Sequence, residues 1–248
     1  MRRKKNKKYK KAILNLILYI ILLSILIYSG IKIFKWHKDK TNNNKIVEQI
    51  KSAVIVEEKN KDEYTVDFNK LKEQNNETIA WLKVNNTNVE YPVVKGTNNS
   101  FYLNHSFDKS NNSAGWIFAD YRNKFDNTDK NIVIYGHNMR DGSMFGSMLN
   151  ILNAKWYENE ENTNITLYTE NEKCIYKVFS VYKIENEDYY IKTEFKNDNE
   201  FEGFIKNLKK RSIKDFNVDV SKEDNILTLS TCANNNKYRV VLHSIKDK

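Results

Sequence analysis

The sequence predicts a mainly β protein: a closed or nearly closed barrel of short strands with a few helices, preceded by one membrane-spanning helix. Two observations lead to this prediction. The first forty residues combine a basic end with a long uncharged apolar run, and the second half is a series of short runs rich in β-branched and aromatic residues. Asparagine-rich turns separate these runs, and the sequence has no internal repeat and no glycine-rich phosphate-binding loop.

The N-terminus predicts a retained membrane anchor. Residues 1–11 hold eight basic residues and no acidic one, and residues 12–31, AILNLILYIILLSILIYSGI, carry no charge. An apolar helix of this length spans about 30 Å, the thickness of the hydrocarbon core of a bilayer. A buried core helix is rarely apolar on every face, and the run lacks a clear signal-peptide cleavage site. We therefore expect a single-pass protein of the cell membrane, with residues 1–11 in the cytoplasm and the domain outside.

The net charge of +9 also belongs to this anchor. Of the 41 Lys and Arg residues, eight lie in the N-terminal segment, so the rest of the chain has 33 basic and 32 acidic residues. The basic excess therefore indicates membrane orientation, and no nucleic-acid partner is expected.

Beyond the anchor, residues 32–64 are predicted to form a polar stalk with a helix over residues 45–57, and residues 65–248 the extracellular domain. A short helix is expected to run into a strand around residues 80–84. Phe201, Phe204, Ile205 and Leu208 are spaced for one face of a helix, which closes on basic residues near the negative end of its dipole. The remaining strands are predicted at VEYPVVK, GWIFADYR, NIVIYGH, NITLYT, CIYKVFSVYKI, NILTLSTC and YRVVLHSI.

The last two predicted strands carry a candidate thiol site. In ILTLSTC, Thr228, Ser230 and Cys232 alternate with apolar residues and so share a polar face. The five-residue turn ANNNK then returns the chain as a hairpin, which brings Arg239 close to Cys232. A guanidinium at that place favours the thiolate and can donate hydrogen bonds to an oxyanion. The other cysteine, Cys174, lies in an apolar run and is expected to be a buried thiol, although a disulfide between the two is left open.

A thiol enzyme also needs a proton carrier, for which the sequence offers four histidines. His137 follows a predicted strand, whereas His105 lies in a loop and His37 in the stalk. His243 shares the face of Arg239 but lies about 13 Å along the strand. His137 is the first candidate and His105 the second, and spacing alone does not decide between them.

At these residues the sequence resembles a known family. TLSTC with a following arginine and a preceding YGHNM resembles the sortases, membrane-anchored cysteine transpeptidases of Gram-positive bacteria. The stretches YPVVKG, YLNHSF, GWIFADYRN, IVIYGHNMRDGSMFGSML, VFSVY and DYYIKTEF resemble class B sortases in the same order, over roughly residues 65–246. The resemblance implies an eight-stranded barrel with the helix of Phe201–Leu208 between the sixth and seventh strands and an active-site groove at one end.

The resemblance also implies roles for individual residues. His137 becomes the catalytic histidine, Cys232 the nucleophile and Arg239 the essential arginine. Substrate contacts are implied for Tyr190, Ile191 and Ser230, and Thr231 is expected to position the substrate or the oxyanion. The sequence departs from some class B members, which carry an acidic residue after the cysteine where this chain has Ala233 and Asn234, and its turn before the arginine is short.

The implied function is a cysteine-type transpeptidase and endopeptidase. Such an enzyme cleaves an NPxTN- or SPxTG-like sorting motif of secreted proteins after threonine, and joins the product through a thioester to a peptidoglycan amine. Neither a metal nor a cofactor is expected. One alternative is a pilin-polymerising sortase, which is less favoured because no second apolar span follows the last strand. Another is a membrane-tethered binding module with an incidental cysteine, which slow alkylation of the thiol would reveal.

Overall fold

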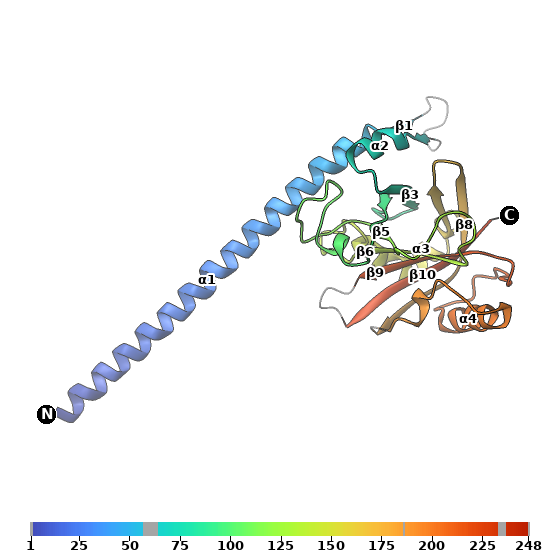
Figure 1. Cartoon of the computed structure of the whole chain (residues 1–248). Helices are drawn as coiled ribbons and strands as arrows, with labels where there is room; N and C mark the ends of the chain where they lie inside the picture. The colour runs from blue at the N-terminus through green and yellow to red at the C-terminus, as the bar shows by residue number, and fades with distance from the viewer. Residues whose placement is uncertain (1, 57–63, 186, 233–236, 248) are drawn as a thin grey trace. The chain divides into compact units, whose positions relative to one another are not determined.

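The structure, a computed structural model, describes residues 2–56, 64–185, 187–232 and 237–247. The chain divides into two compact units, residues 1–44 and residues 45–248. Figure 1 follows the order of their helices and strands along the chain.

Helix α1 (Arg2–Lys51) runs through the first unit and into the second. Its most apolar 18-residue window has a mean hydropathy of 2.4, and none of that window is buried. The helix is therefore long and apolar enough to cross a membrane, as the sequence predicted. The segment after the span, for which a stalk with a helix was expected, is helical in the structure, because α1 continues unbroken to Lys51. Residues 32–51 contain neither Gly nor Pro, so nothing in the backbone stops the helix there.

Eight strands close the barrel of the second unit in the order β10–β8–β7–β3–β4–β5–β6–β9. The sequence prediction of a mainly β barrel is confirmed. Two neighbouring pairs, β4–β5 and β6–β9, are parallel, and the other pairs are antiparallel. The barrel strands are β3 (Thr78–Val84), β4 (Glu90–Val94), β5 (Phe118–Ala119), β6 (Asn131–His137), β7 (Asn164–Tyr168), β8 (Lys173–Glu185), β9 (Ile226–Cys232) and β10 (Tyr238–Lys246).

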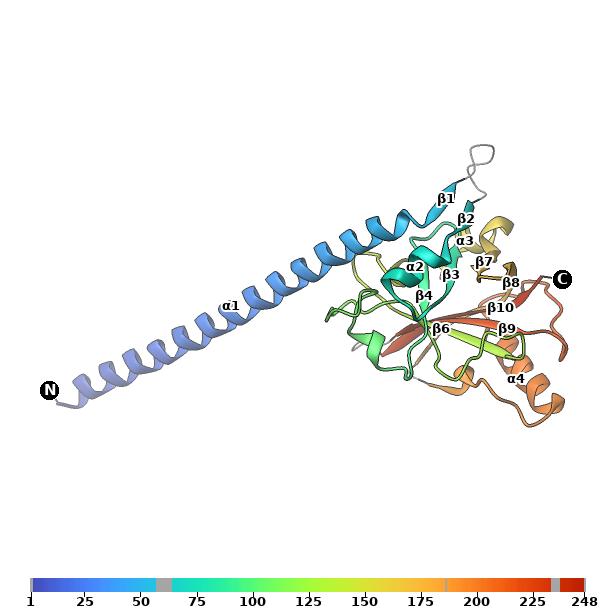
Figure 2. The ribbon, with the colours of Figure 1, turned by 45° about the horizontal axis from the view of Figure 1, so that its top comes forward.

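Shorter elements connect and cover these strands. Figure 2 shows the two-stranded sheet of β1 and β2 beyond the C-terminal end of α1. These elements are β1 (Val54–Val56), β2 (Tyr64–Val66), α2 (Phe68–Gln74), α3 (Ala154–Tyr157), α4 (Asp198–Arg211) and the 3-10 helices η1 (Phe101–Leu103), η2 (Gly146–Leu152), η3 (Glu160–Thr163) and η4 (Tyr189–Ile191).

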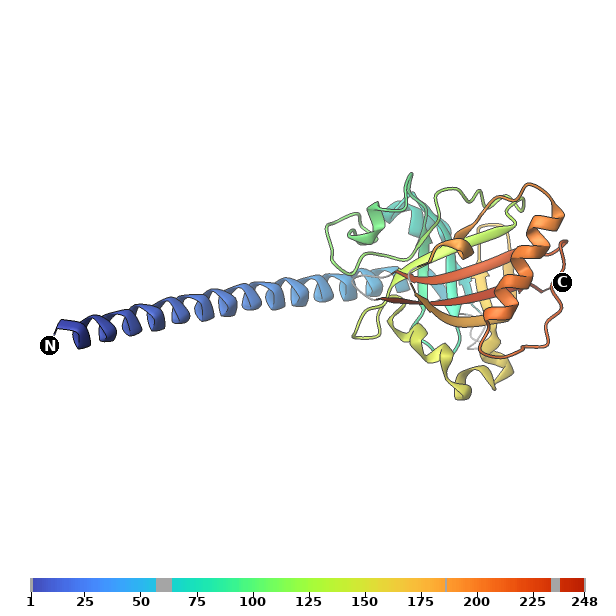
Figure 3. The ribbon, with the colours of Figure 1, turned by 90° about the horizontal axis from the view of Figure 1, so that it is seen from below.

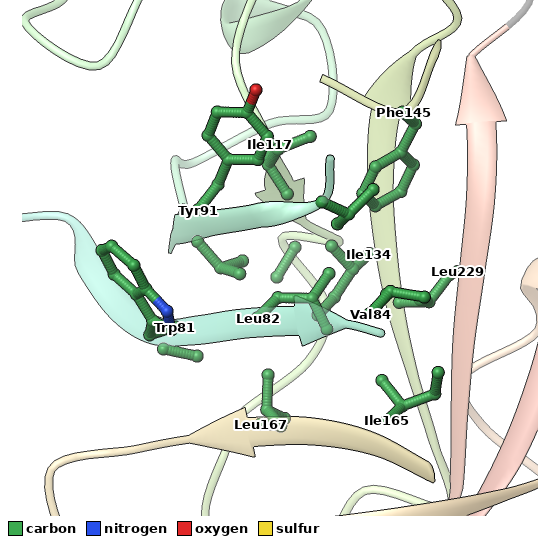
Figure 4. Packing of buried hydrophobic residues seen from close by; sticks show 14 of the residues in the cluster. Trp81, Leu82, Val84, Tyr91, Ile117, Ile134, Phe145, Ile165, Leu167 and Leu229 are labelled. Atoms are coloured by element: carbon green, nitrogen blue, oxygen red, sulfur yellow. The ribbon is translucent and has the colours of Figure 1, made fainter. Parts of the chain in front are cut away.

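The barrel interior is the main hydrophobic core. Leu82, Ile134, Leu167 and Leu229, from four different strands, are at most 1% exposed and point toward one another (Figure 4). The same core includes Ile46, Ile50 and Ala53, so the end of α1 and the turn after it are part of the barrel's packing. The compact unit accordingly begins at residue 45, before the domain boundary predicted at residue 65.

A second hydrophobic cluster lies between α4 and the outside of the barrel. Phe201, Phe204, Ile205 and Leu208 are buried there against side chains of β8, β9 and β10, and Figure 3 shows α4 crossing these strands. Asn197 caps the helix by accepting a hydrogen bond from the Glu200 amide (3.0 Å). In chain order α4 lies between β8 and β9, the sixth and seventh strands of the barrel.

Candidate active site

The two faces of β9 have different surroundings. Leu227 and Leu229 belong to the core inside the barrel, whereas Ile226 belongs to the cluster under α4 on the outside. Thr228 and Ser230 therefore lie on the outer face, as their alternation predicted. Both hydroxyls are buried and hydrogen-bonded, so this face is polar but closed to solvent along most of the strand.

The register of β9 against its two neighbours brings the three predicted catalytic positions together. In the parallel β6–β9 pair, His137 is the register partner of Cys232, and each is the last residue of its strand. In the antiparallel β9–β10 pair, Val241 lies opposite Ser230, and the same register continued by two residues places Arg239 opposite Cys232. The Val240 amide supports this continuation by donating a hydrogen bond to Thr231 Oγ1 (2.9 Å). His137, Cys232 and Arg239 thus occupy neighbouring positions at the ends of three adjacent strands.

Part of this end of the sheet lies outside the described residues. The side chain of Cys232 is not among them, nor are residues 233–236, which include Ala233 and Asn234. The backbone position of Cys232 continues the face of β9 that carries Thr228 and Ser230.

The imidazole of His137 is oriented by one backbone carbonyl. Its Nε2 lies 2.6 Å from the carbonyl oxygen of Leu103 in η1, and the ring is only 6% exposed. A carbonyl can only accept, so the neutral ring carries its proton on Nε2 and keeps a lone pair on Nδ1. Among the described residues, Nδ1 of His137 is a buried polar atom without a hydrogen-bond partner. Burial lowers the pKa of His137, although the bond to Leu103 acts in the opposite direction. The ring therefore holds a proton on Nδ1 only weakly.

Gly115 makes this arrangement possible. It has a φ of +58°, and a Cβ at this position would lie 2.4 Å from the Tyr102 carbonyl oxygen and 2.9 Å from that of Leu103. The same Cβ would lie 3.0 Å from Cδ2 of His137. The loop of Gly115 thus passes directly against the carbonyl that orients the catalytic candidate.

The other histidines that the sequence offered have different surroundings. His243 is fully buried under α4, where its Nδ1 lies 2.8 Å from Thr228 Oγ1 and its Nε2 lies 2.8 Å from Tyr182 Oη. Burial lowers its pKa to about 3. His105 stacks on Phe101, and its Nδ1 lies 2.8 Å from the Phe101 carbonyl oxygen. Only His137 is the register partner of Cys232.

Cys174 is a buried free thiol. The disulfide with Cys232 that the cysteine count left open is therefore not formed. Burial raises the pKa of the Cys174 thiol, which disfavours the reactive thiolate.

The four residues predicted to contact substrate differ in exposure. Tyr190 in η4 is fully buried, and its hydroxyl lies 2.8 Å from Ser230 Oγ, so these two side chains join η4 to β9. Thr231 is 2% exposed, and its Oγ1 accepts the hydrogen bond from the Val240 amide. Ile191 is only partly buried, and of the four it is the residue that a ligand can reach from solvent in this conformation.

An ion pair beside η4, between a buried carboxylate and a partly exposed guanidinium, was not singled out by the sequence reasoning. Asp120 follows β5 and is fully buried, and Arg122 donates to both of its carboxylate oxygens, from Nε at 2.8 Å and from Nη2 at 2.7 Å. The same Nη2 donates to the Ile191 carbonyl oxygen (3.0 Å). The only signal in the sequence is an acidic and a basic residue two positions apart in FADYR, a common pattern on exposed turns.

Comparisons with known proteins agree with this geometry. A sortase domain model matches residues 82–246. Sortase B of Listeria monocytogenes is 32% identical over 236 residues, which cover 92% of this chain and 93% of the relative. The Staphylococcus aureus sortase B–substrate complex superposes with a TM-score of 0.74 at 30% identity, covering 86% of this chain and 97% of that chain. The structure of Clostridium perfringens sortase B has a TM-score of 0.68 at 36% identity, covering 73% of this chain and 100% of that chain.

The sortase match begins within β3 and ends with β10, so it includes nearly the whole barrel and all three strands that carry the candidate site. The chain therefore belongs to the sortase family, and within it to the class B sortases, which are cysteine transpeptidases.

Proposed function

We propose that Cys232 is the nucleophile, His137 the proton carrier and Arg239 the oxyanion-stabilising cation of a sorting-motif transpeptidase. The observation that supports this best is the register of β6, β9 and β10, which aligns these three positions at one end of adjacent strands. Within the described residues, His137 Nδ1 has no hydrogen-bond partner, which adds to this support because a proton carrier needs one ring nitrogen that can bind the transferred proton.

The first half of the reaction forms a thioester. The Cys232 thiolate attacks the carbonyl carbon of the threonine in the motif, and Arg239 with a backbone N–H stabilises the oxyanion. The C–N bond then breaks, and the leaving amine takes a proton from Nδ1 of protonated His137. Because burial lowers the pKa of this ring, the imidazolium is a stronger acid than a solvated one and gives up the proton more readily.

The second half transfers the acyl group. A peptidoglycan amine attacks the thioester carbonyl, His137 Nδ1 accepts the proton that this amine loses, and the C–S bond breaks to restore the thiolate. The product is a secreted protein joined to the cell wall through a new amide bond.

The substrate is a secreted protein with an NPxTN- or SPxTG-like motif. The S. aureus sortase B complex contains a substrate, which supports substrate binding by this related chain. Ile191 contacts the peptide directly, whereas Tyr190 and Ser230 shape the wall behind it through their mutual hydrogen bond. Thr231 fixes the spacing of β9 and β10 next to Cys232 by binding the Val240 amide.

The enzyme works at the outer surface of the cell membrane. The apolar part of α1 crosses the bilayer with the basic N-terminus in the cytoplasm. Secreted substrates emerge at that surface, where the anchored barrel meets them together with the amine acceptors of the wall.

The test is a peptide assay on the full-length chain in detergent. Quenched fluorescent peptides with NPxTN, SPxTG and LPxTG motifs are incubated with and without diaminopimelate or triglycine, and the products are identified by mass spectrometry. Cleavage after threonine with the amine joined to it is expected for the wild type and for the matched control Cys174→Ala. Cys232→Ala is expected to abolish both, and a Cys232→Ala chain that still forms the product would refute the proposal.

A further inference from the structure

The backbone of residues 189–192, called here the recognition segment, is held by side chains rather than by strand pairing. Asn131 Nδ2 on β6 donates to the carbonyl oxygens of Tyr190 (3.1 Å) and Lys192 (2.9 Å). Between them, the Ile191 carbonyl oxygen accepts from Arg122 Nη2 (3.0 Å). Three consecutive carbonyls are thus fixed by two side chains.

Arg122 can hold this carbonyl because Asp120 fixes its guanidinium. The planar guanidinium binds the Asp120 carboxylate through Nε and Nη2, and Nη2 still has a second hydrogen for Ile191. A lysine ammonium has the same charge but cannot reproduce this forked geometry.

Asp120 is in turn tied to the sheet that carries the candidate catalytic positions. Its carboxylate accepts from Tyr135 Oη (2.9 Å) and from Asn99 Nδ2 (2.8 Å), and its backbone amide donates to the Val133 carbonyl oxygen (2.8 Å). Tyr135 is two residues before His137 on β6 and is the register partner of Ser230. Burial raises the pKa of Asp120, but hydrogen bonds from Arg122, Tyr135 and Asn99 outweigh that effect and lower it overall. The carboxylate is therefore charged at neutral pH and pairs with the arginine there.

We infer that Arg122, fixed by Asp120, is a positioning residue that holds the recognition segment against β6 and thereby sets peptide selectivity. The side-chain contacts described for Arg122 are with Asp120 and the Ile191 carbonyl, and it acts through that carbonyl. This inference rests on the proposed function, in which Ile191 contacts the peptide.

The experiment compares three variants of the full-length chain in detergent. Arg122→Lys keeps the positive charge but loses the paired N–H donors of the planar guanidinium. The double variant Asp120→Asn/Arg122→Met removes both charges, so it leaves no unpaired buried carboxylate and guards against a simple folding failure. Lys72→Gln is the control, because it removes an exposed ion pair with Glu170 (2.6 Å) that does not involve the recognition segment.

Losing a hydrogen bond from a charged donor is expected to raise KM for the preferred peptide about ten-fold in both Arg122 variants. In both variants, kcat is expected to stay within about two-fold of wild type. The differences in kcat/KM among the three motifs are expected to become smaller. Alkylation of Cys232 by iodoacetamide at pH 7 should keep its rate, because the catalytic positions are untouched. A fall in kcat at unchanged KM, or no change in either constant, would overturn the inference.

Amide hydrogen exchange separates this inference from the proposed function. Peptides covering residues 187–195 should exchange at least about ten-fold faster in both Arg122 variants and at the wild-type rate in Lys72→Gln. This readout needs no substrate, so it tests the role of Arg122 even if none of the three motifs is cleaved. Unchanged exchange in both Arg122 variants would refute the role whatever the activity.

Discussion

At the scale of single residues, the environment of His137 is set by backbone atoms. The Leu103 carbonyl fixes the tautomer of the ring, and the loop of Gly115 packs against that carbonyl and against the ring itself. The position of the imidazole therefore depends on a glycine that has no chemical role of its own.

Replacing Gly115 by alanine is expected to harm both stability and activity. The φ of +58° and a Cβ only 2.4 Å from the Tyr102 carbonyl oxygen force the loop to move, and Leu103 and His137 with it. Strain of this kind costs about 1–3 kcal/mol of unfolding free energy, and kcat/KM should fall with it. Thermal unfolding and peptide cleavage measure the two effects.

Gly203 provides the matched control for that change. It lies inside α4 with no atom within 4 Å of an added Cβ, so Gly203→Ala should stabilise the helix by up to about 1 kcal/mol. Equal effects at the two glycines would contradict the role given to Gly115.

His243 is expected to make stability depend on pH. In the unfolded chain an imidazole takes up a proton below about pH 6.5, whereas burial keeps the pKa of folded His243 at about 3. Between these values the unfolded state binds more protons, so the unfolding free energy falls as the pH falls, by up to about 1.4 kcal/mol per pH unit. His243→Asn removes this titration. Chemical unfolding from pH 6.5 to 4 should show a shallower slope in the variant, and parallel slopes would contradict the assignment.

The residues that could be predicted from the sequence are those whose signal is local. Cys232 and Arg239 lie in one hairpin, and the motif around His137 marks the end of a strand. Arg122 and Ile191 are 69 positions apart, and their contact depends on how η4 folds back over the barrel. No periodicity or short motif encodes such a contact.

At the scale of secondary-structure elements, the longer barrel strands and α4 were predictable because their period-two and period-3.6 patterns are strong. Residues 54–56 were expected in a helix and form β1 instead. The end of α1 was predicted less well. A helix was expected over residues 45–57, but α1 ends at Lys51, and Ile46 and Ile50 bury their side chains in the barrel's core.

Truncation tests this part of the helix. A chain that begins at residue 45 keeps Ile46 and Ile50 and should unfold at the same temperature as the full chain. A chain that begins at residue 54 loses both, and burial of two isoleucines corresponds to about 3–6 kcal/mol. Thermal unfolding of the two truncated chains gives the comparison. If the two truncated chains unfold at the same temperature, the end of α1 contributes nothing to the stability of the folded unit.

At the scale of the whole molecule, charge and hydropathy are divided between the N-terminal segment and the rest. Eight of the basic residues precede the apolar run, and the chain beyond them is almost neutral. Orientation in the membrane should therefore depend on a short segment.

Replacing the basic residues of segment 2–11 by glutamine is expected to mix or invert the orientation, because Lys32, Lys35, Lys38 and Lys40 would then carry the larger positive charge. Digestion of intact protoplasts by an added protease measures the fraction of barrels outside. Replacing those four lysines instead should leave every barrel outside. Uniform outside orientation in both variants would show that the basic segment does not direct insertion.

The parallel pairing of β6 with β9 has a consequence for when the enzyme becomes active during secretion. In the proposed membrane topology, translocation delivers the chain from the N-terminus onward, so β6 emerges long before β9, and the hydrogen bond from Thr228 to Asn131 joins residues 97 positions apart. Until β9 and β10 have crossed and inserted, the chain outside the membrane holds a histidine with no thiol or guanidinium beside it. In the proposed mechanism, closing the barrel is therefore also the step that completes the active site, and a partly exported chain cannot form a thioester with the secreted proteins that pass next to it.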